Sequence, residues 1–260
     1  ESLIPLPPLE EQCRIVARIE ELFARIEQAR RLRGVATIEA QCLLDAVLCD
    51  FFLEDGSARW EEVPVGELTV YGPDNGIFVK KDRFGSGTLL VNVSDLYSTP
   101  SVVLDSLDRV RIDLEKSERV LLEPGDVLVN RSSVKLEGLG RSCLFGGAPE
   151  PVVFECHIMR LRFNQELIAP MLFVMFMNSR LGLRRIMDRA KQGTMATWNQ
   201  GDLKSVSFPL PPLEEQQRMV ERLSSVHAQM ALLKRAHDTA EDDLERLEQS
   251  ILARGFRGEL

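Results

Sequence analysis

The feature that most constrains the fold is an octapeptide that occurs twice, PLPPLEEQ at residues 5–12 and again at 209–216. The offset between the copies is far longer than the unit of a solenoid repeat. Prolines stiffen an extended approach and are tolerated in the first helical turn. The glutamate pairs Glu10–Glu11 and Glu214–Glu215 place negative charge near the positive end of a helix dipole. Each copy therefore predicts the start of a helix.

A heptad pattern of apolar residues follows each copy and predicts two long helices that pair as an antiparallel coiled coil. The second pattern comprises Leu223, Val226, Met230, Leu233, His237, Ala240, Leu244, Leu247, Ile251 and Arg254. The equivalent first pattern comprises Ile19, Leu22, Ile26, Ala29, Arg33, Ala36, Ala40, Leu43, Val47 and Asp50. Both hold a polar residue at the same level, Arg33 and His237, which costs stability and fixes register. We expect the helices to run from about Leu9 to Leu53 and from the second octapeptide to Gly255 or Gly258.

The residues between the helices predict a mixed, strand-rich domain, so the expected fold class is α+β. Short β-rich runs are separated by Gly, Pro, Asp and Ser. The domain begins with Trp60–Val70, and the runs are Thr88–Val93, Val102–Val103, Arg119–Leu122, Asp126–Asn130 and Val152–Phe163. A helix is expected over Pro170–Ala190. The expected division is a spacer helix over residues 1–56, a strand-rich domain over 57–207 and a second spacer helix over 208–260.

Composition limits the classes of protein to which the chain can belong. A chain of 260 residues, 44% of them hydrophobic, can bury a core, but its longest apolar run, Met171–Met177, is too short to span a bilayer. No charged-then-apolar leader opens the sequence, which favours a cytoplasmic protein. The five cysteines are scattered without a CxxC pair, which favours reduced thiols over a disulfide framework or a zinc site.

Positive charge is concentrated in one part of an acidic chain. The net charge is −8, yet the stretch from Asn130 to Lys204 holds eleven basic and six acidic residues. Such a local surplus is compatible with a nucleic-acid partner although the total charge is not.

Three clusters in the middle of the chain carry side chains suited to DNA. Arginine can contact guanine and asparagine can contact adenine through two hydrogen bonds each, while Ser, Thr and Lys suit phosphate contacts. The first cluster is Asn130, Arg131, Ser132, Ser133, Lys135 and Arg141. The second is Tyr71, Asn75, Lys80 and Lys81. The third is Gln192, Thr194 and Thr197, and it lies beside an arginine row of Arg180, Arg184 and Lys191. Strand-end loops are commonly rich in Asn, Ser and Gly, and arginine rows are commonly solvated, so these structural interpretations stay open beside the functional one.

The order of these motifs resembles the DNA-specificity subunit of Type I restriction–modification systems. The resemblance rests on PLPPLEEQ and its helix, then GDVLVNRSS and GLGRSCLF, then ECHIMRLRF, and finally QGTMATWNQGDLKSVSFPLPPLEEQ with the second helix. It implies a target recognition domain that reads one half of a bipartite sequence in double-stranded DNA. It also implies helices that dock DNA methyltransferase (modification) subunits, with a restriction motor subunit as a further partner.

The chain departs from this family pattern because it carries one recognition domain where the full subunit carries two. It therefore resembles a half-length form or the C-terminal half of such a subunit. A homodimer, or pairing with another half-subunit, would restore the bipartite reader, and a homodimer would read an interrupted palindrome.

No catalytic motif accompanies this resemblance. The sequence contains no P-loop, no glycine-rich cofactor loop of a methyltransferase and no NPPY-like tetrapeptide, and its three histidines have no evident partner. We therefore expect no cofactor and no bound metal, with the chemistry supplied by partner subunits. Two alternatives remain: a coiled-coil scaffold for protein partners, and a recognition module cut from a single-chain restriction–modification enzyme.

Overall fold

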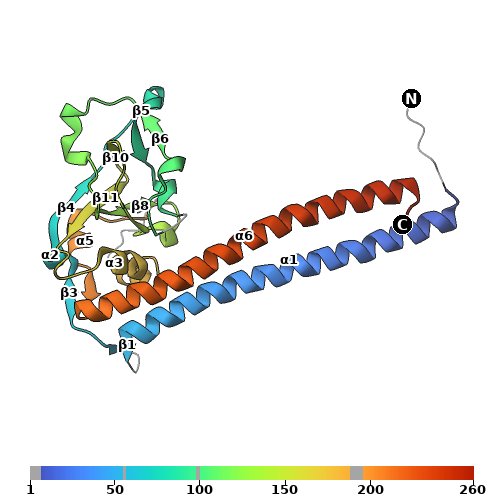
Figure 1. The fold of residues 1–260 in the computed structure, drawn as a ribbon, viewed down its shortest axis with the longest axis horizontal. Helices are drawn as coiled ribbons and strands as arrows, with labels where there is room; N and C mark the ends of the chain where they lie inside the picture. Colours follow the sequence, from blue (N-terminus) through green and yellow to red (C-terminus); the bar gives the residue numbers. More distant parts are fainter. Residues whose placement is uncertain (1–6, 55–56, 98–99, 188–195) are drawn as a thin grey trace. The chain divides into compact units, whose positions relative to one another are not determined.

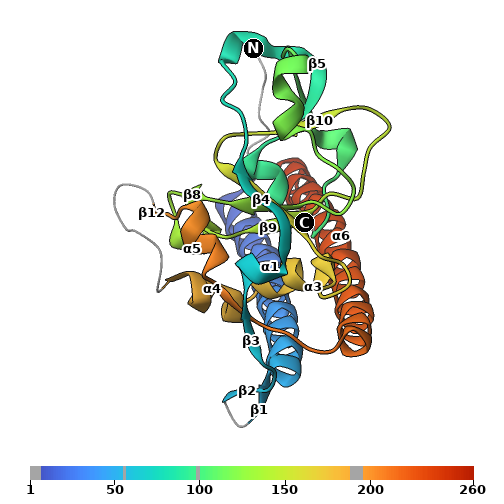
Figure 2. The same ribbon diagram turned by 90° about the vertical axis from the view of Figure 1, so that its left-hand side faces the viewer.

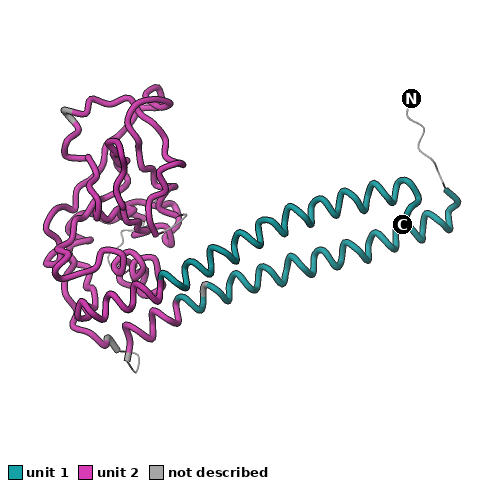
Figure 3. Tube along the Cα trace, viewed as in Figure 1, with its two compact units in different colours: residues 1–44, 224–260 teal, residues 45–223 magenta. Residues whose placement is uncertain are grey.

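The computed structural model describes residues 7–54, 57–97, 100–187 and 196–260. The chain forms two compact units, Glu1–Leu44 with Ser224–Leu260, and Asp45–Leu223 (Figure 3). The borders of these units fall inside the two long helices, whereas the division expected from the sequence follows the ends of the helices. The division at residues 56 and 207 stays a prediction.

The first unit is a pair of antiparallel helices drawn from α1 (Leu9–Phe52) and α6 (Leu213–Arg257), which lie side by side in Figure 1. Arg30 forms ion pairs with Glu241 at 2.8 Å and with Glu248 at 2.7 Å. Arg33 forms an ion pair with Glu241 at 2.8 Å and donates a hydrogen bond to the His237 carbonyl oxygen. These contacts join the middle of one helix to the middle of the other and confirm the predicted antiparallel pairing.

The apolar seam of the hairpin follows the predicted heptads up to residue 43, where the buried position moves to Leu44, although the predicted position Val47 is also buried. Ile26 is buried as expected, but Leu43 is 55% exposed and the next residue, Leu44, is buried instead. A straight helix of 3.6 residues per turn drifts away from a repeat of 3.5, so a seven-residue pattern loses its face along a long helix. The predicted seam position Asp50 is likewise exposed, while Leu48 is buried.

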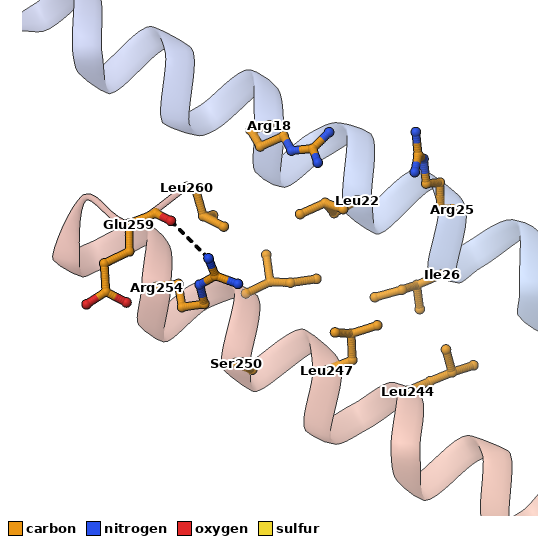
Figure 4. Close-up of a pocket in the computed structure, with 11 residues that line it drawn as sticks. Arg18, Leu22, Arg25, Ile26, Leu244, Leu247, Ser250, Arg254, Glu259 and Leu260 are labelled. Atoms are coloured by element: carbon orange, nitrogen blue, oxygen red, sulfur yellow. Dashed lines mark hydrogen bonds between the residues drawn. The ribbon is translucent and has the colours of Figure 1, made fainter.

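The end of the hairpin is closed by a glycine that permits close approach of the helices. A Cβ atom on Gly255 would lie 2.8 Å from Cδ1 of Ile19, so the Ile19 side chain would have to shift to admit a larger residue. Figure 4 shows Leu22 and Ile26 facing Leu244 and Leu247 across the adjoining shallow pocket. Helix α6 ends at Arg257, and Gly258 follows in the left-handed region with φ of 71°, as a C-terminal stop requires.

The second unit contains two small sheets whose strands come from distant parts of the chain. The four-stranded sheet has the order β4 (Thr69–Asn75), β11 (Ile158–Phe163), β7 (Val127–Asn130) and β9 (Ser142–Leu144), all antiparallel. The three-stranded sheet has the order β10 (Val152–Phe154), β5 (Phe84–Val91) and β6 (Asp108–Val110), with β10 parallel to β5.

Short strand pairs and helices complete this unit. The pairs are β12 (Ala196–Thr197) with β8 (Ser132–Ser133), β13 (Ser207–Pro209) with β3 (Glu62–Pro64), and β1 (Leu53–Glu54) with β2 (Ser57–Ala58). The helices are α2 (Val65–Leu68), α3 (Pro170–Met177), α4 (Arg180–Met187) and α5 (Gln200–Lys204). Short 3₁₀ segments among the described residues cover Lys81–Arg83, Val93–Leu96, Leu104–Ser106, Glu115–Val120 and Leu136–Gly138.

An aromatic cluster anchors the inner ends of the long helices within the second unit. Phe52 at the end of α1 packs edge-on against Phe176 of α3, with ring centroids 5.1 Å apart. Phe208 of β13 lies 5.2 Å from Phe176 and 5.9 Å from Phe173. Since these rings are buried, the cluster contributes the large apolar area that aromatic side chains supply to a core.

Three predictions of secondary structure are wrong in detail. The helix expected over Pro170–Ala190 is broken between α3 and α4, where the Asn178 side chain bonds to the backbone of Ser142 through its oxygen and its nitrogen, each at 2.8 Å. Arg119–Leu122 is not a strand, because residues up to Val120 form a 3₁₀ turn. Val102–Val103 lies outside the named strands, beside an isolated bridge at Ser101.

No helix in the described ranges has the length and apolar character needed to cross a membrane.

Candidate nucleic-acid interface

One end of the four-stranded sheet gathers the first two predicted clusters. Strands β4 and β7 run in the same direction and end at Asn75 and Asn130, while β11 begins between them. Met159 of β11 pairs with Asn75, and Ile158 pairs with Asn130. Residues separated by more than fifty positions in the sequence therefore leave the sheet from the same end.

The loop that follows β7, residues 131–138, is held in place by Asn130. Its side chain is fully buried, donates a hydrogen bond to the Gly138 carbonyl oxygen at 2.7 Å and accepts one from the Ser132 amide at 3.2 Å. A buried amide side chain is satisfied only when both of its ends are bonded. The expectation that Asn130 reads a base is therefore revised: it positions the 131–138 loop.

Trp198 fixes the same loop from the other side and joins the first cluster to the third. Its indole Nε1 donates to the Asn130 carbonyl oxygen at 3.0 Å, and its backbone amide donates to the Arg131 carbonyl oxygen at 3.1 Å. Strands β12 and β8 pair beside it, with Thr197 opposite Ser132 (Figure 2). Thr197 thus lies with the serines of the loop, although more than sixty residues separate them.

Gly138 closes the loop because no side chain fits at its position. A Cβ atom there would lie 2.3 Å from both the Ser133 and the Tyr97 hydroxyl oxygens. The guanidinium of Arg141 lies over the Tyr97 ring at 5.6 Å and donates to the Asn178 carbonyl oxygen at 3.3 Å. Tyr97 is a contact that the sequence reasoning missed, since nothing in the neighbouring sequence marks it as part of this cluster.

Two polar atoms in this region are buried without a hydrogen-bond partner among the described residues. They are the hydroxyl oxygen of Ser132 and Nε of Arg141. A buried polar atom left unpaired is costly and commonly marks a place where a ligand or water completes the bonding. Both belong to the first predicted cluster.

The second cluster divides between the sheet end and the segment beyond it. Asn75 is exposed at the end of β4, and Lys80 and Lys81 are exposed on the segment that leads to the three-stranded sheet. Tyr71 instead packs against arginines, with Arg160 4.5 Å and Arg162 5.6 Å from its ring centre. Asn75 and the lysines are therefore available to a ligand, whereas Tyr71 has a role in supporting the sheet.

Much of the positive charge counted in the sequence is neutralised inside the domain. Arg160 is 2% exposed and donates to the carbonyl oxygens of Leu121 and Arg119, each at 2.9 Å. Arg162 binds the fully buried Asp126 at 2.8 Å, and this hydrogen bond raises the pKa of Arg162.

Arg180 of the predicted arginine row and the nearby Arg185 are also paired within the domain. Arg180 of α4 lies 3.1 Å from the Asp45 carboxylate, and Arg185 donates to Glu62 at 2.9 Å. Lys135 and Arg184 are exposed and Arg131 is half-buried, so these three are the better candidates for contacts with phosphate or bases. The predicted residues Lys191, Gln192 and Thr194 lie outside the described part of the chain.

In chain order, a strand-rich domain lies between two long helices, and this arrangement defines the class of helix-flanked recognition modules. The family model "Type I restriction modification DNA specificity domain" matches residues 58–241, and the chain belongs to this family. The match begins with the strand-rich domain and continues into α6.

Relatives with known names agree with this assignment. The chain is 26% identical to the Type I restriction enzyme StySPI specificity subunit of Salmonella potsdam, with 99% of this chain and 57% of the relative covered. It is also 26% identical to the EcoKI specificity subunit of Escherichia coli K12, with the same coverage. The chain thus spans a little over half the length of these curated relatives.

Solved structures share the fold. One solved structure concerns the complex assembly and conformational transition of the type I R-M system. A chain of that structure matches with a TM-score of 0.75 and 28% identity, and the match covers 99% of this chain and 62% of that one. The HsdS subunit from Thermoanaerobacter tengcongensis has a TM-score of 0.56 and 29% identity, covering 100% and 61%. The α+β fold with two long helices is therefore confirmed.

Proposed function

We propose that this chain is a non-catalytic specificity module that reads one half of a bipartite target in double-stranded DNA. The observation that carries the proposal is the convergence of Arg131, Ser132, Lys135 and Thr197 on one braced loop at the end of a sheet. Base recognition requires side chains that are held in fixed positions, because their placement decides which base can form the hydrogen bonds. A rigid scaffold that presents such side chains provides this placement.

The proposed contacts fall into two groups with different effects. Arg131 and the unpaired Ser132 hydroxyl lie on the braced loop and are assigned to bases and the adjacent backbone. Lys80, Lys81, Lys135 and Arg184 are exposed cations assigned to phosphates, which set position without reading sequence. Asn75, Ser133, Arg141 and Thr197 complete the proposed interface.

The paired helices are assigned to partner subunits. In this proposal they dock DNA methyltransferase (modification) subunits and, in the complete system, a restriction motor subunit, so the chemistry resides in partners and the complex works in the cytoplasm. A homodimer, or pairing with another half-subunit, would place two recognition domains on one duplex. Protein symmetry is mirrored in the DNA, so the homodimer requires an interrupted palindrome as its target.

Salt-dependent binding to duplex DNA tests the proposal against a coiled-coil protein scaffold. Each DNA phosphate that the protein neutralises adds about −0.9 to the slope of log K against log salt. A protein that contacts several phosphates should therefore lose affinity for the duplex steeply as the salt concentration rises. A flat or absent response would support the scaffold.

A methylation assay tests the half-site arrangement. The full chain would be combined with modification subunits and a pool of random duplexes, and the methylated sequences would be read. Inverted symmetry in the selected target is expected for the homodimer, whereas a target without inverted symmetry would rule that version out.

A further inference from the structure

The turn between β10 and β11 places three potential metal ligands next to one another. Glu155, Cys156 and His157 each offer one donor atom, and all three atoms lie within 4.8 Å of one another. Sequence reasoning assigned no partner to His157, yet its Nδ1 is in short contact with the Glu155 carboxylate. The cluster lies apart from the cysteines of the long helices, so it forms a distinct group within the strand-rich unit.

The backbone of this turn is fixed on both sides. The Ile158 amide donates to the Glu155 carbonyl oxygen at 3.0 Å, which closes the turn and brings consecutive side chains together. The Glu155 amide in turn donates to the Val91 carbonyl oxygen at 3.1 Å. Because the turn is anchored to strand β5, its three donor atoms are held without the long loop closure that a scattered site requires.

Two of the three donor separations match the edges of a zinc tetrahedron. The Cys156 sulfur lies 3.6 Å from His157 Nδ1 and 3.5 Å from a Glu155 carboxylate oxygen. Bonds of about 2.3 Å to sulfur and about 2.0–2.1 Å to nitrogen or oxygen give edges of about 3.6 Å at tetrahedral angles. The Glu155 carboxylate and His157 Nδ1 are in closer contact than such an edge. When a metal binds Nδ1, the neutral imidazole would carry its proton on Nε2, and the two groups would move apart.

We propose that Glu155, Cys156 and His157 form a binding site for one Zn²⁺ ion, with solvent at the fourth position. A mixed set of thiolate, imidazole and carboxylate suits zinc, whereas magnesium and calcium prefer oxygen ligands alone. The His157 side chain is 49% exposed and the Glu155 side chain 21% exposed, so the ion can enter from solvent. Binding releases the thiol proton of Cys156 to solvent.

The site would brace the proposed DNA-reading loop. The Arg131 amide donates to the His157 carbonyl oxygen at 2.9 Å, so the residue that carries the ligand also holds the start of the 131–138 loop. Bound zinc would restrict the turn and, through this bond, the position of Arg131. The metal site itself does not depend on the proposed function, because it rests on the geometry of the turn alone.

Cobalt binding to the full, reduced chain under anaerobic conditions tests the site. Co²⁺ substitutes for zinc, and a cobalt–thiolate bond gives a near-ultraviolet charge-transfer band together with the visible bands of four-coordinate cobalt. We expect one Co²⁺ per chain and displacement of the bands by Zn²⁺. The variant Cys156→Ser should lack the charge-transfer band, and His157→Ala should bind cobalt about tenfold more weakly or worse.

Cys42→Ser provides the matched control, because Cys42 is an exposed thiol on α1 and belongs to the other compact unit. It should bind cobalt as the parent chain does. The proposal is wrong if the parent chain gives no thiolate band, or if Cys156→Ser gives the same band at the same stoichiometry. DNA is absent from the assay, so its outcome is separate from that of the duplex-binding test.

Discussion

The two copies of PLPPLEEQ begin helices of nearly equal length, 44 residues for α1 and 45 for α6, but their glutamines make different contacts. Gln216 is fully buried. Its Nε2 donates to the Leu167 and Pro211 carbonyl oxygens at 2.9 and 2.8 Å, and its carbonyl oxygen accepts from the Ala169 amide at 2.7 Å. Gln12 is half-buried and donates to the Pro7 carbonyl oxygen at 2.7 Å.

The comparison separates what the octapeptide does by itself from what a neighbouring domain adds. Both glutamines donate to the proline carbonyl five residues earlier, so this bond belongs to the local sequence. The bonds to Leu167 and Ala169 come from the strand-rich domain and are made by the second copy. The two identical octapeptides therefore begin a helix in the same way, but the second is held by additional hydrogen bonds from the strand-rich domain.

The largest expected effect is that of Gln216→Ala. Truncation removes the three hydrogen bonds of the buried Gln216 side chain, to Ala169, Leu167 and Pro211, and each such bond is worth about 0.5–1.5 kcal/mol. We expect the free energy of unfolding of the strand-rich unit to fall by about 3 kcal/mol. Urea unfolding followed by tryptophan fluorescence measures the change, and a loss below about 1 kcal/mol would contradict the assigned role of Gln216.

A smaller effect is expected at the polar position that the two heptad patterns share. Arg33→Ala removes an ion pair with Glu241 and a hydrogen bond to the His237 carbonyl oxygen, so the thermal midpoint of the helix pair should fall. The loss should be larger at low salt, since salt screens the ion pair. Arg31→Ala, at an exposed neighbouring position, is the control and should change little; equal losses in both variants would count against the seam assignment.

The first helix also differs from the second at Gly34, whose equivalent in the second helix is Asp238. A Cβ atom on Gly34 would meet nothing within 4 Å, so Gly34→Ala should stabilise the hairpin by about 0.5–1 kcal/mol. Gly255→Ala is the matched comparison, because its Cβ atom would lie 2.8 Å from Cδ1 of Ile19 and the Ile19 side chain would have to shift, which offsets part of the gain in helix propensity. Calorimetry should therefore give a larger upward midpoint shift for Gly34→Ala than for Gly255→Ala, and an equal or larger shift for Gly255→Ala would contradict this interpretation.

The smallest expected effect is that of Gln12→Ala. It removes the local bond to Pro7 from a half-buried side chain, which is worth about 1 kcal/mol or less. The urea midpoint should move much less than in Gln216→Ala. Equal shifts in the two variants would mean that the contacts with Leu167 and Ala169 do not set the difference between the copies.

The sequence predicted those parts of the fold that depend on local patterns. The helix starts follow from the prolines and glutamates of the octapeptide, and the end of α6 follows from Gly258. The register shift between Leu43 and Leu44 escaped prediction because a heptad count assumes a constant helical repeat. The break between α3 and α4 escaped it because the bonds from Asn178 to Ser142 are non-local.

The candidate site was predicted in the same uneven way. Arg131, Ser132 and Lys135 were proposed because they follow a predicted strand, but the pairing of Thr197 with Ser132 depends on tertiary structure. A count of charges overstated the basic surface, since it could not show that Arg160 and Arg162 are neutralised by buried partners. Likewise, an asparagine at a strand end has the same sequence signature whether it reads a base or, like Asn130, holds a loop.

The central claim is that the braced loop reads sequence while exposed cations supply general affinity, and paired binding measurements on two variants test it most directly. Affinity for the selected target and for a random duplex would be measured across a range of salt concentrations. Arg131→Ala should lose about 1–3 kcal/mol on the target and little on the random duplex. Arg184→Ala should weaken binding to the target and to the random duplex equally. It should also reduce the slope of log K against log salt by about 1, which corresponds to one phosphate contact. If both variants bind target and random duplex as the parent chain does, the assignment of this loop to DNA reading is wrong.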